Sequence, residues 1–361
     1  MTGGGVYPAI AVLQALKGKT DEVLWLGSHS GMEETMLKQY DLNFEAVSAA
    51  GLHGVSLRSL PGNVNQLLHG LREANAIIKR FKPQVLFFTG GYLGVPVAFA
   101  GRKIPSVVFI PDIEPGLALK AILKFSRSIS VSTEKSIAFL KSKQAKVTGY
   151  PIRSELKKWD RATARKYFAI PEKESVLLVF GGSKGALSIN QALFASLSSL
   201  LKDMHVIHIS GKDHWDEGQK VQTTLDAALR NKYHAYPFLY EEIGAAFAAA
   251  DLAICRAGAS TLGELPFFGL PAVLVPYPHA WRYQQQNAEY LQENGGAAIL
   301  DDADLRNQLE SKVRSLINNP GQLSAMRSAM KALSNPDAAQ QIADMIISTG
   351  TASLLKEDSY G

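Results

Sequence analysis

VLLVFGGSKGALSINQAL, residues 176–193, contains a continuous apolar run, a pair of glycines and an amphipathic stretch in immediate succession. A continuous apolar run is typical of a parallel strand that helices cover on both faces. Glycines directly after such a strand allow a tight turn into the following helix. The segment therefore predicts a β-strand, a turn and an α-helix of a parallel α/β sheet.

Similar apolar runs, each followed by a longer amphipathic stretch, occur along the rest of the chain in two series. The first comprises residues 22–27, 44–49, 84–91, 106–112, 128–133 and 146–151, and the second residues 176–182, 204–210, 233–239, 251–258, 272–278 and 297–302. This alternation predicts two doubly wound, Rossmann-like α/β domains with parallel sheets and a crevice between them. We place the domains at residues 1–149 and 150–335, followed by a C-terminal helix and tail over residues 336–361.

The chain opens on Thr2, Gly3, Gly4 and Gly5, directly before the helix-like residues 7–16. This pattern predicts a strand-to-helix loop, but no strand-like run comes before it. We therefore expect the first strand of the sheet to be missing, either because the start codon is assigned too late or because the chain is cut. In a doubly wound sheet that strand is interior, so its loss predicts a gap or a destabilised edge.

Composition narrows the class of protein. The 361 residues are 46% apolar and 20% charged, as in packed globular proteins. A single cysteine, Cys255, cannot form an internal disulfide, which favours a cytoplasmic location. No apolar run approaches the roughly 20 residues that cross a bilayer. The sequence contains no zinc-ligand spacing, basic repeat or aromatic RNA motif, so we expect no nucleic-acid partner.

Charge is distributed unevenly between the two predicted domains. Residues 1–149 carry 17 Lys and Arg against 10 Asp and Glu, whereas residues 150–361 carry 21 against 23. Residues 50–83 mix apolar side chains with Arg58, Arg72, Lys79, Arg80 and Lys82. Part of this segment could dock on an anionic membrane. The alternative is a crossover helix with a solvated basic face.

Two turns of the second domain have the chemistry of an anion or nucleotide site. In the first, residues 181–186, Ser183 offers a hydroxyl and the following helix offers free N–H groups. The spacing of its glycines is not that of a P-loop. In the second, Thr261 and Glu264 are three residues apart before an apolar helix. This spacing suits a capping box, and it equally suits a loop that grips ribose hydroxyls and a pyrophosphate.

Six motifs in the same order resemble those of the bacterial MurG transferases, and the resemblance covers nearly the whole chain. They are TGGGVYPAIAV (2–12), TGGYLGVPVA (89–98), GYPIR (149–153), GGSKGA (181–186), RAGASTLGE (256–264) and LPAVLVPYPHA (270–280). The resemblance implies a GT-B fold that binds UDP-N-acetylglucosamine in the interdomain cleft, with no cofactor. It implies inverting transfer of N-acetylglucosamine to an undecaprenyl-linked muramyl pentapeptide, by a peripheral enzyme on the cytoplasmic face of the cell membrane.

The resemblance also implies roles for individual residues. Thr2, Gly3 and Gly4 correspond to a glycine loop near the acceptor and donor phosphates, and Tyr92 to an acceptor-side tyrosine whose alternative role is packing. Arg153 corresponds to a donor-binding arginine, with an interdomain salt bridge as the alternative, and Ser183 to the serine that faces the diphosphate. The remaining donor-side positions are Tyr240 at the uracil, the loop Ala259, Ser260, Thr261, Leu262, Gly263 and Glu264, with Glu264 on the ribose, and Gln284 at the sugar hydroxyls.

Two motifs depart from the family pattern on the acceptor side. Gly5 stands where the family has a histidine, and residues 109–112 read FIPD where the family has HEQN. Inverting transfer needs a base for the acceptor hydroxyl. We expect Asp112 to be this base, with Glu114 as second choice, because both follow a predicted strand. Their alternative role is as turn and cap residues.

Metal-independent chemistry is expected because no strand-end Asp-x-Asp pair is present to hold a cation beside a diphosphate. We expect the cluster Asp301, Asp302 and Asp304 to form a solvated turn and helix cap. A helix dipole, hydroxyl groups and Arg153 would then stabilise the leaving UDP. The departures leave three alternatives open: a transferase with another lipid or sugar acceptor, a UDP-sugar epimerase, and a catalytically silent donor-binding subunit.

Overall fold

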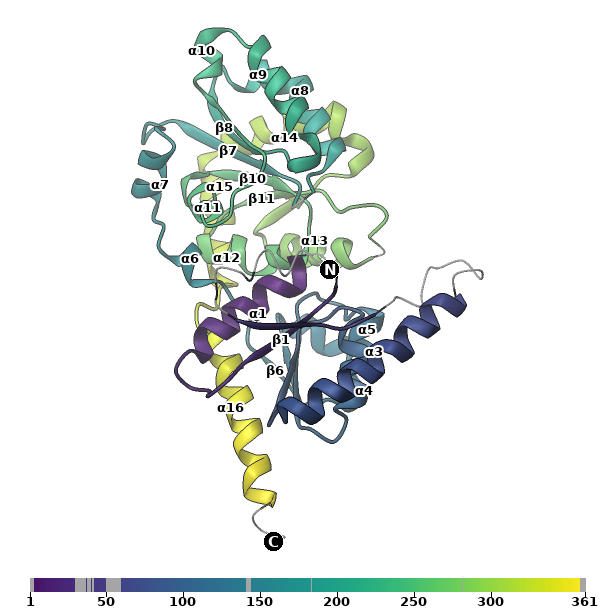
Figure 1. Ribbon diagram of the computed structural model, residues 1–361. Helices are drawn as coiled ribbons and strands as arrows, with labels where there is room; N and C mark the ends of the chain where they lie inside the picture. Colours follow the sequence, from purple (N-terminus) through teal and green to yellow (C-terminus); the bar gives the residue numbers. More distant parts are fainter. Residues whose placement is uncertain are drawn as a thin grey trace. The chain divides into compact units, whose positions relative to one another are not determined.

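The computed structural model describes residues 3–29, 37, 40, 42–49, 60–140, 144–182, 184–280 and 282–357 (Figure 1). The chain divides into two compact units, Met1–Pro151 with Asp337–Gly361, and Ile152–Pro336. Each of the twelve predicted apolar runs contains a strand, and every strand pairing is parallel. The predicted α/β class with two parallel-sheet units is therefore confirmed.

The second unit contains one six-stranded sheet in the order β12-β11-β10-β7-β8-β9. Its strands are β7 (Ser175–Phe180), β8 (Met204–Ile209), β9 (Tyr233–Tyr236), β10 (Leu252–Cys255), β11 (Ala272–Leu274) and β12 (Ala297–Ile299). The first strand along the chain, β7, lies in the interior and pairs with β10 on one side and β8 on the other. This is the order of a doubly wound sheet.

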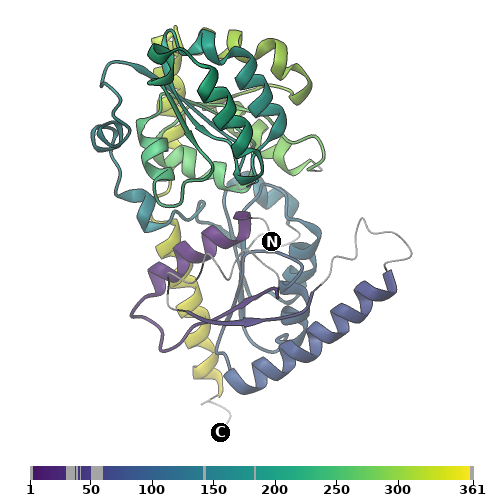
Figure 2. The ribbon, with the colours of Figure 1, turned by 45° about the horizontal axis from the view of Figure 1, so that its top comes forward.

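Helices cover both faces of this sheet (Figure 2). They are α6 (Ser154–Lys157), α7 (Arg161–Tyr167), α8 (Leu187–Leu200), α9 (Trp215–Thr224), α10 (Ala227–Arg230), α11 (Ile243–Ala249), α12 (Glu264–Phe268), α13 (Tyr283–Glu293), α14 (Leu305–Ile317) and α15 (Pro320–Ala332). On one face α8 and α14 pack on Leu177 and Val179 of β7. On the other, Phe180 contacts Phe247 of α11.

The turn after β7 is tight, as the glycines in the sequence predict, and it packs closely against the end of β8. Gly182 and Gly185 have φ of +87° and +84°, in the left-handed region that glycine adopts without strain. A Cβ added at Gly185 would lie 2.1 Å from the carbonyl oxygen of Ser210, which follows β8. Gly185 therefore needs glycine both for its backbone angles and for this close approach, and Gly182 needs it for its backbone angles.

The first unit contains two separate sheets. One consists of β1 (Leu24–Gly27) and β2 (Asn43–Ala46), and the other of β3 (Leu86–Phe88), β4 (Ser106–Ile110), β5 (Ser128–Val131) and β6 (Ala145–Val147). Its helices are α1 (Gly3–Leu16), α3 (Leu60–Phe81), α4 (Gly94–Ala100), α5 (Leu117–Ile122) and α16 (Ala338–Glu357). The C-terminal helix α16 lies beside α1 and also contacts β4 (Figures 1 and 2).

The predicted loop over Gly3, Gly4 and Gly5 is wrong in one respect, because α1 already begins at Gly3. Glycine can adopt helical angles, and the first turn of a helix requires no intrahelical acceptor for its N–H groups. The start of α1 lies at the end of β3, where the Thr89 hydroxyl donates a hydrogen bond to the Gly5 carbonyl (2.7 Å). Thr2 lies outside the described residues.

The two units differ in how their first strands along the chain are paired. In the second unit the first strand, β7, separates β8 from β10. In the first unit β1 and β3 hold the corresponding places, and among the described residues β1 pairs only with β2 and β3 only with β4. We therefore expect β1 and β3 each to have one edge without a strand partner.

Hydrogen exchange can test this prediction. We expect the backbone amides of β1 and β3 to exchange faster than those of β7 and β10, because each of the first pair has one unpaired edge and each of the second pair has strands on both sides. Exchange followed by mass spectrometry at peptide resolution would measure the difference. Protection of β1 and β3 equal to that of β7 would contradict the gap.

Candidate functional site

The connections that follow β7, β10 and β11 emerge at the carboxyl edge of the second unit's sheet. Open α/β sheets bind ligands at this edge. Residues 181–186 lead from β7 to α8, residues 256–263 from β10 to α12, and residues 275–282 from β11 to α13. Ten substrate-binding positions are predicted in the second unit, and seven of them, from Ala259 to Gln284, fall on or beside the last two connections.

Arg153, Ser260 and Glu264 form a polar cluster at this edge. Glu264 is the first residue of α12, and burial raises the pKa of its carboxyl group. The charge of Arg153 and a hydrogen bond from Ser260 act on Glu264 in the opposite direction, so all three groups lie within interaction range. Arg153 itself is buried immediately before α6. A carboxylate beside a guanidinium and a hydroxyl is suited to binding a polar, anionic ligand.

The loop from Ala259 to Gly263 is a 3₁₀-helix, Ala259–Leu262, followed by a glycine. The Thr261 hydroxyl donates to the Gly258 carbonyl (2.6 Å), and Thr261 is buried. The capping-box interpretation is wrong, because the N-cap of α12 is Gly263 and makes no side-chain cap bond. Thr261 therefore shapes the loop, whereas Ser260 and Glu264 supply its polar groups.

The N-terminus of α8 has the electrostatic character that an anion site requires. The helix has 14 residues, and its N-cap, Ala186, offers no side-chain acceptor to the first N–H groups. Such an end carries a partial positive charge. The buried Asn190 fixes α8 against the neighbouring loop by donating to the Ser210 carbonyl (2.9 Å). Ser183, predicted to face a diphosphate, lies outside the described residues.

Gln284 and Tyr240 occupy the remaining predicted donor-side positions. The Gln284 side-chain oxygen accepts a hydrogen bond from the Tyr277 backbone N–H (2.9 Å), so it orders the connection after β11. Tyr240 follows β9 and is 52% exposed. Its ring meets Phe238 edge to face at 4.7 Å, and the Lys212 ammonium lies 5.8 Å from its centroid. Sequence analysis missed Lys212 and Phe238, which complete an exposed aromatic and cationic surface.

In the first unit, Tyr92 lies in the turn between β3 and α4. Gly90 and Gly91, directly before it, have φ of +124° and +86°. These angles turn the chain sharply, and the Tyr92 side chain is left 51% exposed. Tyr92 therefore presents a ring just beyond the carboxyl end of β3, and Thr89, three residues before it, is the residue that bonds to Gly5.

Asp112 and Glu114 both follow β4, at the carboxyl end of that strand. Asp112 is partly buried, and its carbonyl accepts a hydrogen bond from the Ser136 hydroxyl (3.4 Å). Glu114 is buried, with one carboxylate oxygen 2.7 Å from the Lys120 ammonium. Because Asp112 is partly accessible and Glu114 is buried in an ion pair, Asp112 is the stronger candidate for a base.

Four further residues lie at the carboxyl edge of the second unit's sheet and were not assigned to the site from the sequence: Ser188, Arg256, Asn287 and Asp302. Arg256 binds Ser188 and Asp302, and Asn287 donates to the Ala257 carbonyl (3.1 Å). The expectation that Asp302 is a solvated turn residue is wrong, because its side chain is 22% exposed and ion-paired. Two signals in the sequence pointed to Arg256: it directly follows the run 251–255, and it is the first residue of the motif RAGASTLGE.

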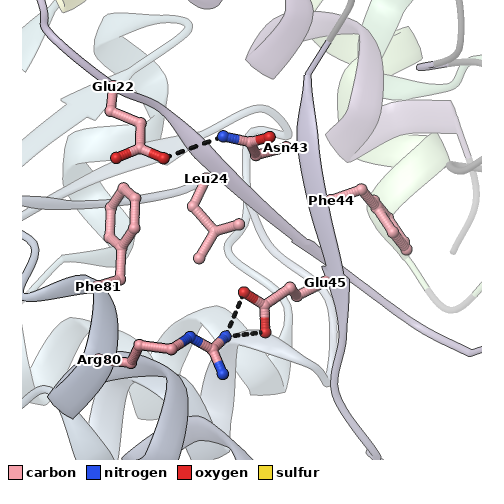
Figure 3. Close-up of a pocket in the computed structure, with 7 residues that line it drawn as sticks. All are labelled: Glu22, Leu24, Asn43, Phe44, Glu45, Arg80 and Phe81. Carbon is pink, nitrogen blue, oxygen red and sulfur yellow. Dashed lines mark hydrogen bonds and ion pairs between the residues drawn. The ribbon is translucent and has the colours of Figure 1, made fainter.

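A separate cavity of about 390 Å³ lies in the first unit (Figure 3). Figure 3 shows Arg80 paired with Glu45, and Asn43 with Glu22, among the lining residues Glu22, Leu24, Asn43, Phe44, Glu45, Arg80 and Phe81. Leu24 and Asn43 are the first residues of their strands. The cavity therefore lies at the amino ends of β1 and β2, opposite the edge at which α/β sheets bind ligands.

Two further properties apply only to the part of the chain that the structure describes. No three His, Cys, Asp or Glu side chains there are grouped so as to hold a metal ion. None of the helices there combines the length and the apolar character that crossing a bilayer needs.

Comparison with known proteins gives family matches in both units. The description "Glycosyltransferase family 28 N-terminal domain" matches residues 2–131, and "Glycosyltransferase family 28 C-terminal domain" matches residues 176–342. Two relatives are named UDP-N-acetylglucosamine--N-acetylmuramyl-(pentapeptide) pyrophosphoryl-undecaprenol N-acetylglucosamine transferase. The one from Roseiflexus sp. is 35% identical over 96% of this chain and 92% of its own, and the one from Desulforudis audaxviator is 36% identical over 96% and 95%.

Solved structures show the same fold. MurG of Acinetobacter baumannii superposes with a TM-score of 0.73 at 24% identity, over 95% of this chain and 96% of its own. A UDP-GlcNAc 2-epimerase from Neisseria meningitidis gives 0.68 at 14% identity, over 96% and 98%. A transferase and an epimerase thus share the architecture, so the fold does not choose between them. The two domain matches and the full-length relatives do: the chain belongs to glycosyltransferase family 28.

Proposed function

We propose that this protein transfers N-acetylglucosamine from UDP-N-acetylglucosamine to an undecaprenyl-linked muramyl pentapeptide, in peptidoglycan synthesis. The observation that carries the proposal is the cluster of Arg153, Ser260 and Glu264 at the carboxyl edge of the second unit's sheet. Relatives that match over more than nine-tenths of their length carry this activity in their names. The proposal assigns the donor to the second unit and the acceptor to the first.

Each donor group has a matching group in the second unit. The Glu264 carboxylate can accept hydrogen bonds from the two ribose hydroxyls. The N-terminus of α8 and the Arg153 guanidinium offer positive charge to the diphosphate. Because charge builds up on the diphosphate as the sugar leaves, these fixed groups stabilise the transition state more than the ground state. We propose that they do so without a metal ion.

The transfer itself forms one bond and breaks one. The acceptor hydroxyl oxygen attacks the anomeric carbon, the bond from that carbon to the phosphate oxygen breaks, and UDP leaves with the bonding electrons. The configuration at the anomeric carbon inverts, and the hydroxyl proton passes to a base. We propose Asp112 for this role, since it is only partly buried, whereas Glu114 is buried and forms an ion pair with Lys120.

Acceptor-dependent UDP release in chelator tests the function. We expect the protein to release UDP from UDP-N-acetylglucosamine only when a lipid-linked muramyl pentapeptide is present, at the same rate with EDTA as with Mg²⁺. The sugar should be recovered on the lipid by mass spectrometry.

The other outcomes separate the alternatives. Transfer to a different lipid or sugar would contradict the proposed acceptor. Conversion of the donor to its 2-epimer without acceptor would indicate an epimerase, and UDP binding without any turnover a silent subunit. Loss of activity in EDTA that Mg²⁺ restores would contradict the metal-independent step.

Asp112→Asn tests the assignment of the base. The amide cannot accept the proton, so we expect kcat to fall by roughly 10²- to 10⁴-fold with little change in the donor KM. Glu114→Gln should have a smaller effect on kcat. Asp21→Asn, at an exposed position of the same unit, controls for the change of charge. Turnover of Asp112→Asn within a few fold of the unmodified protein would remove Asp112 from the mechanism.

We further propose that the first unit binds the cytoplasmic face of an anionic membrane, where a lipid-linked acceptor resides. The described part of the basic segment is α3, whose Gly70, Ala74 and Ile77 are buried. Its opposite face exposes Leu68, Arg72 and Lys79. This face is mainly basic, so the attraction would be largely electrostatic. Arg58 lies outside the described residues.

Vesicle co-sedimentation tests this attraction. Binding to phosphatidylglycerol vesicles should exceed binding to phosphatidylcholine vesicles and weaken as salt is raised. Arg72→Glu combined with Lys79→Glu should reduce it. The matched control is Lys166→Glu with Lys173→Glu, two exposed lysines of the second unit. Equal binding to neutral and anionic vesicles would contradict docking through α3. An equal loss of vesicle binding in the two double variants would contradict it as well.

A further inference from the structure

Arg256 bonds to three different segments at the carboxyl edge of the second unit's sheet. We call this edge, to which the UDP-sugar donor is assigned, the donor edge. Its guanidinium donates to the Ser188 hydroxyl (2.8 Å) and the Val275 carbonyl (3.3 Å), and it forms an ion pair with Asp302. The Ser188 hydroxyl in turn donates to the same Asp302 oxygen (2.8 Å). Arg256, Ser188 and Asp302 therefore form a closed triangle of hydrogen bonds, which we call the donor-edge triangle.

The donor-edge triangle connects the two loops to which we assign the donor. Ser188 is the second residue of α8, whose N-terminus we assign to the diphosphate. Arg256 is two residues before Gly258, the N-cap of the 3₁₀-helix that leads to Glu264. The Arg256 guanidinium also lies 5.2 Å from the centre of the Tyr277 ring, and Gln284 holds the Tyr277 backbone. One side chain thus fixes three donor-side connections relative to one another.

A second triangle of the same chemistry lies at the other end of α8. Arg314 donates to the Ser199 hydroxyl (3.1 Å) and to Glu310 (2.9 Å), and Ser199 donates to the same Glu310 oxygen (2.6 Å). Ser199 is in the last turn of α8, away from the donor edge. The protein therefore contains a matched pair of triangles, only one of which adjoins the proposed site.

We infer that Arg256, together with Ser188 and Asp302, is a positioning group that sets the distance and orientation between the N-terminus of α8 and the Glu264 loop. The inference rests on the proposed function, because it concerns binding of a nucleoside diphosphate. Arg256 does not serve as the counter-charge of the diphosphate, since Asp302 already neutralises it and its donors are directed to Ser188, Val275 and Asp302.

UDP binding by paired variants tests the inference. Arg256→Gln and Asp302→Asn should each raise the Kd for UDP by roughly 10- to 100-fold, because small displacements of a binding group are costly. The donor KM should rise by a similar factor, with a smaller change in kcat. Arg314→Gln and Glu310→Gln, the matched controls, should leave the Kd for UDP within about twofold. Calorimetric titration with UDP measures all four variants.

Two variants separate positioning from direct contact. If Arg256 bound the phosphates itself, Asp302→Asn would release it and leave UDP binding unchanged or tighter, and Arg256→Lys would keep most of the affinity. Either result would overturn the inference. Positioning instead requires Arg256→Lys to remain weakened, because an ammonium cannot reproduce the forked geometry. Should Arg256→Gln fail to fold, Asp302→Asn and Ser188→Ala carry the same test.

Hydrogen exchange without any nucleotide gives an independent readout. Arg256→Gln should increase exchange both in the peptide spanning residues 186–193 and in the peptide spanning residues 258–265. Arg314→Gln should leave exchange in the second of these peptides, and UDP binding, unchanged. If the unmodified protein bound UDP and the variants of both triangles bound it equally well, the inference would be overturned and the proposed function would remain intact. If the unmodified protein bound no UDP, the proposed function would fail, and unchanged exchange at 258–265 would also exclude the coupling.

Discussion

The structure depends on parallel pairing of strands that are buried on both faces. β7 is the clearest case, because Val176 to Val179 are fully buried and the strand has a partner on each side. Since all six strands run in one direction, their connections emerge at one edge, where helix N-termini and loops meet. The proposed donor site follows from this constraint, as the second unit brings residues 153, 260 and 264 together there.

The sequence predicted the parts of the structure that local patterns determine. Continuous apolar runs identified all twelve strands, and glycines after a run identified the turn at Gly182 and Gly185. Partners from distant segments could not be predicted in this way. Asp302 is 46 residues from Arg256, and the local pattern DDAD resembles any solvated turn. The 3₁₀-helix at Ala259–Leu262 was missed because its spacing also fits a capping box.

The proposed donor and acceptor sides differ in the side-chain contacts that support them. On the donor side, Glu264 is a carboxyl group whose burial disfavours its ionised form, opposed by Arg153 and Ser260. A bound ribose would supply further hydrogen bonds to the ionised form, so binding and ionisation are linked. On the acceptor side, Gly5 has no side chain, and the charged groups after β4 are Asp112 and the paired Glu114. The proposed base therefore depends on a smaller set of contacts.

The division of the first unit into two sheets has a consequence for the protein in solution. A two-stranded sheet and a four-stranded sheet have four edge strands between them, whereas the single sheet of the second unit has two. Among the described residues the additional edges, β1 and β3, have backbone donors and acceptors without a strand partner, and such groups can pair with another extended chain. Strands of four and three residues offer few such groups, which limits the attraction. Self-association through these edges would therefore increase with protein concentration and originate in the first unit, whatever the state of the second.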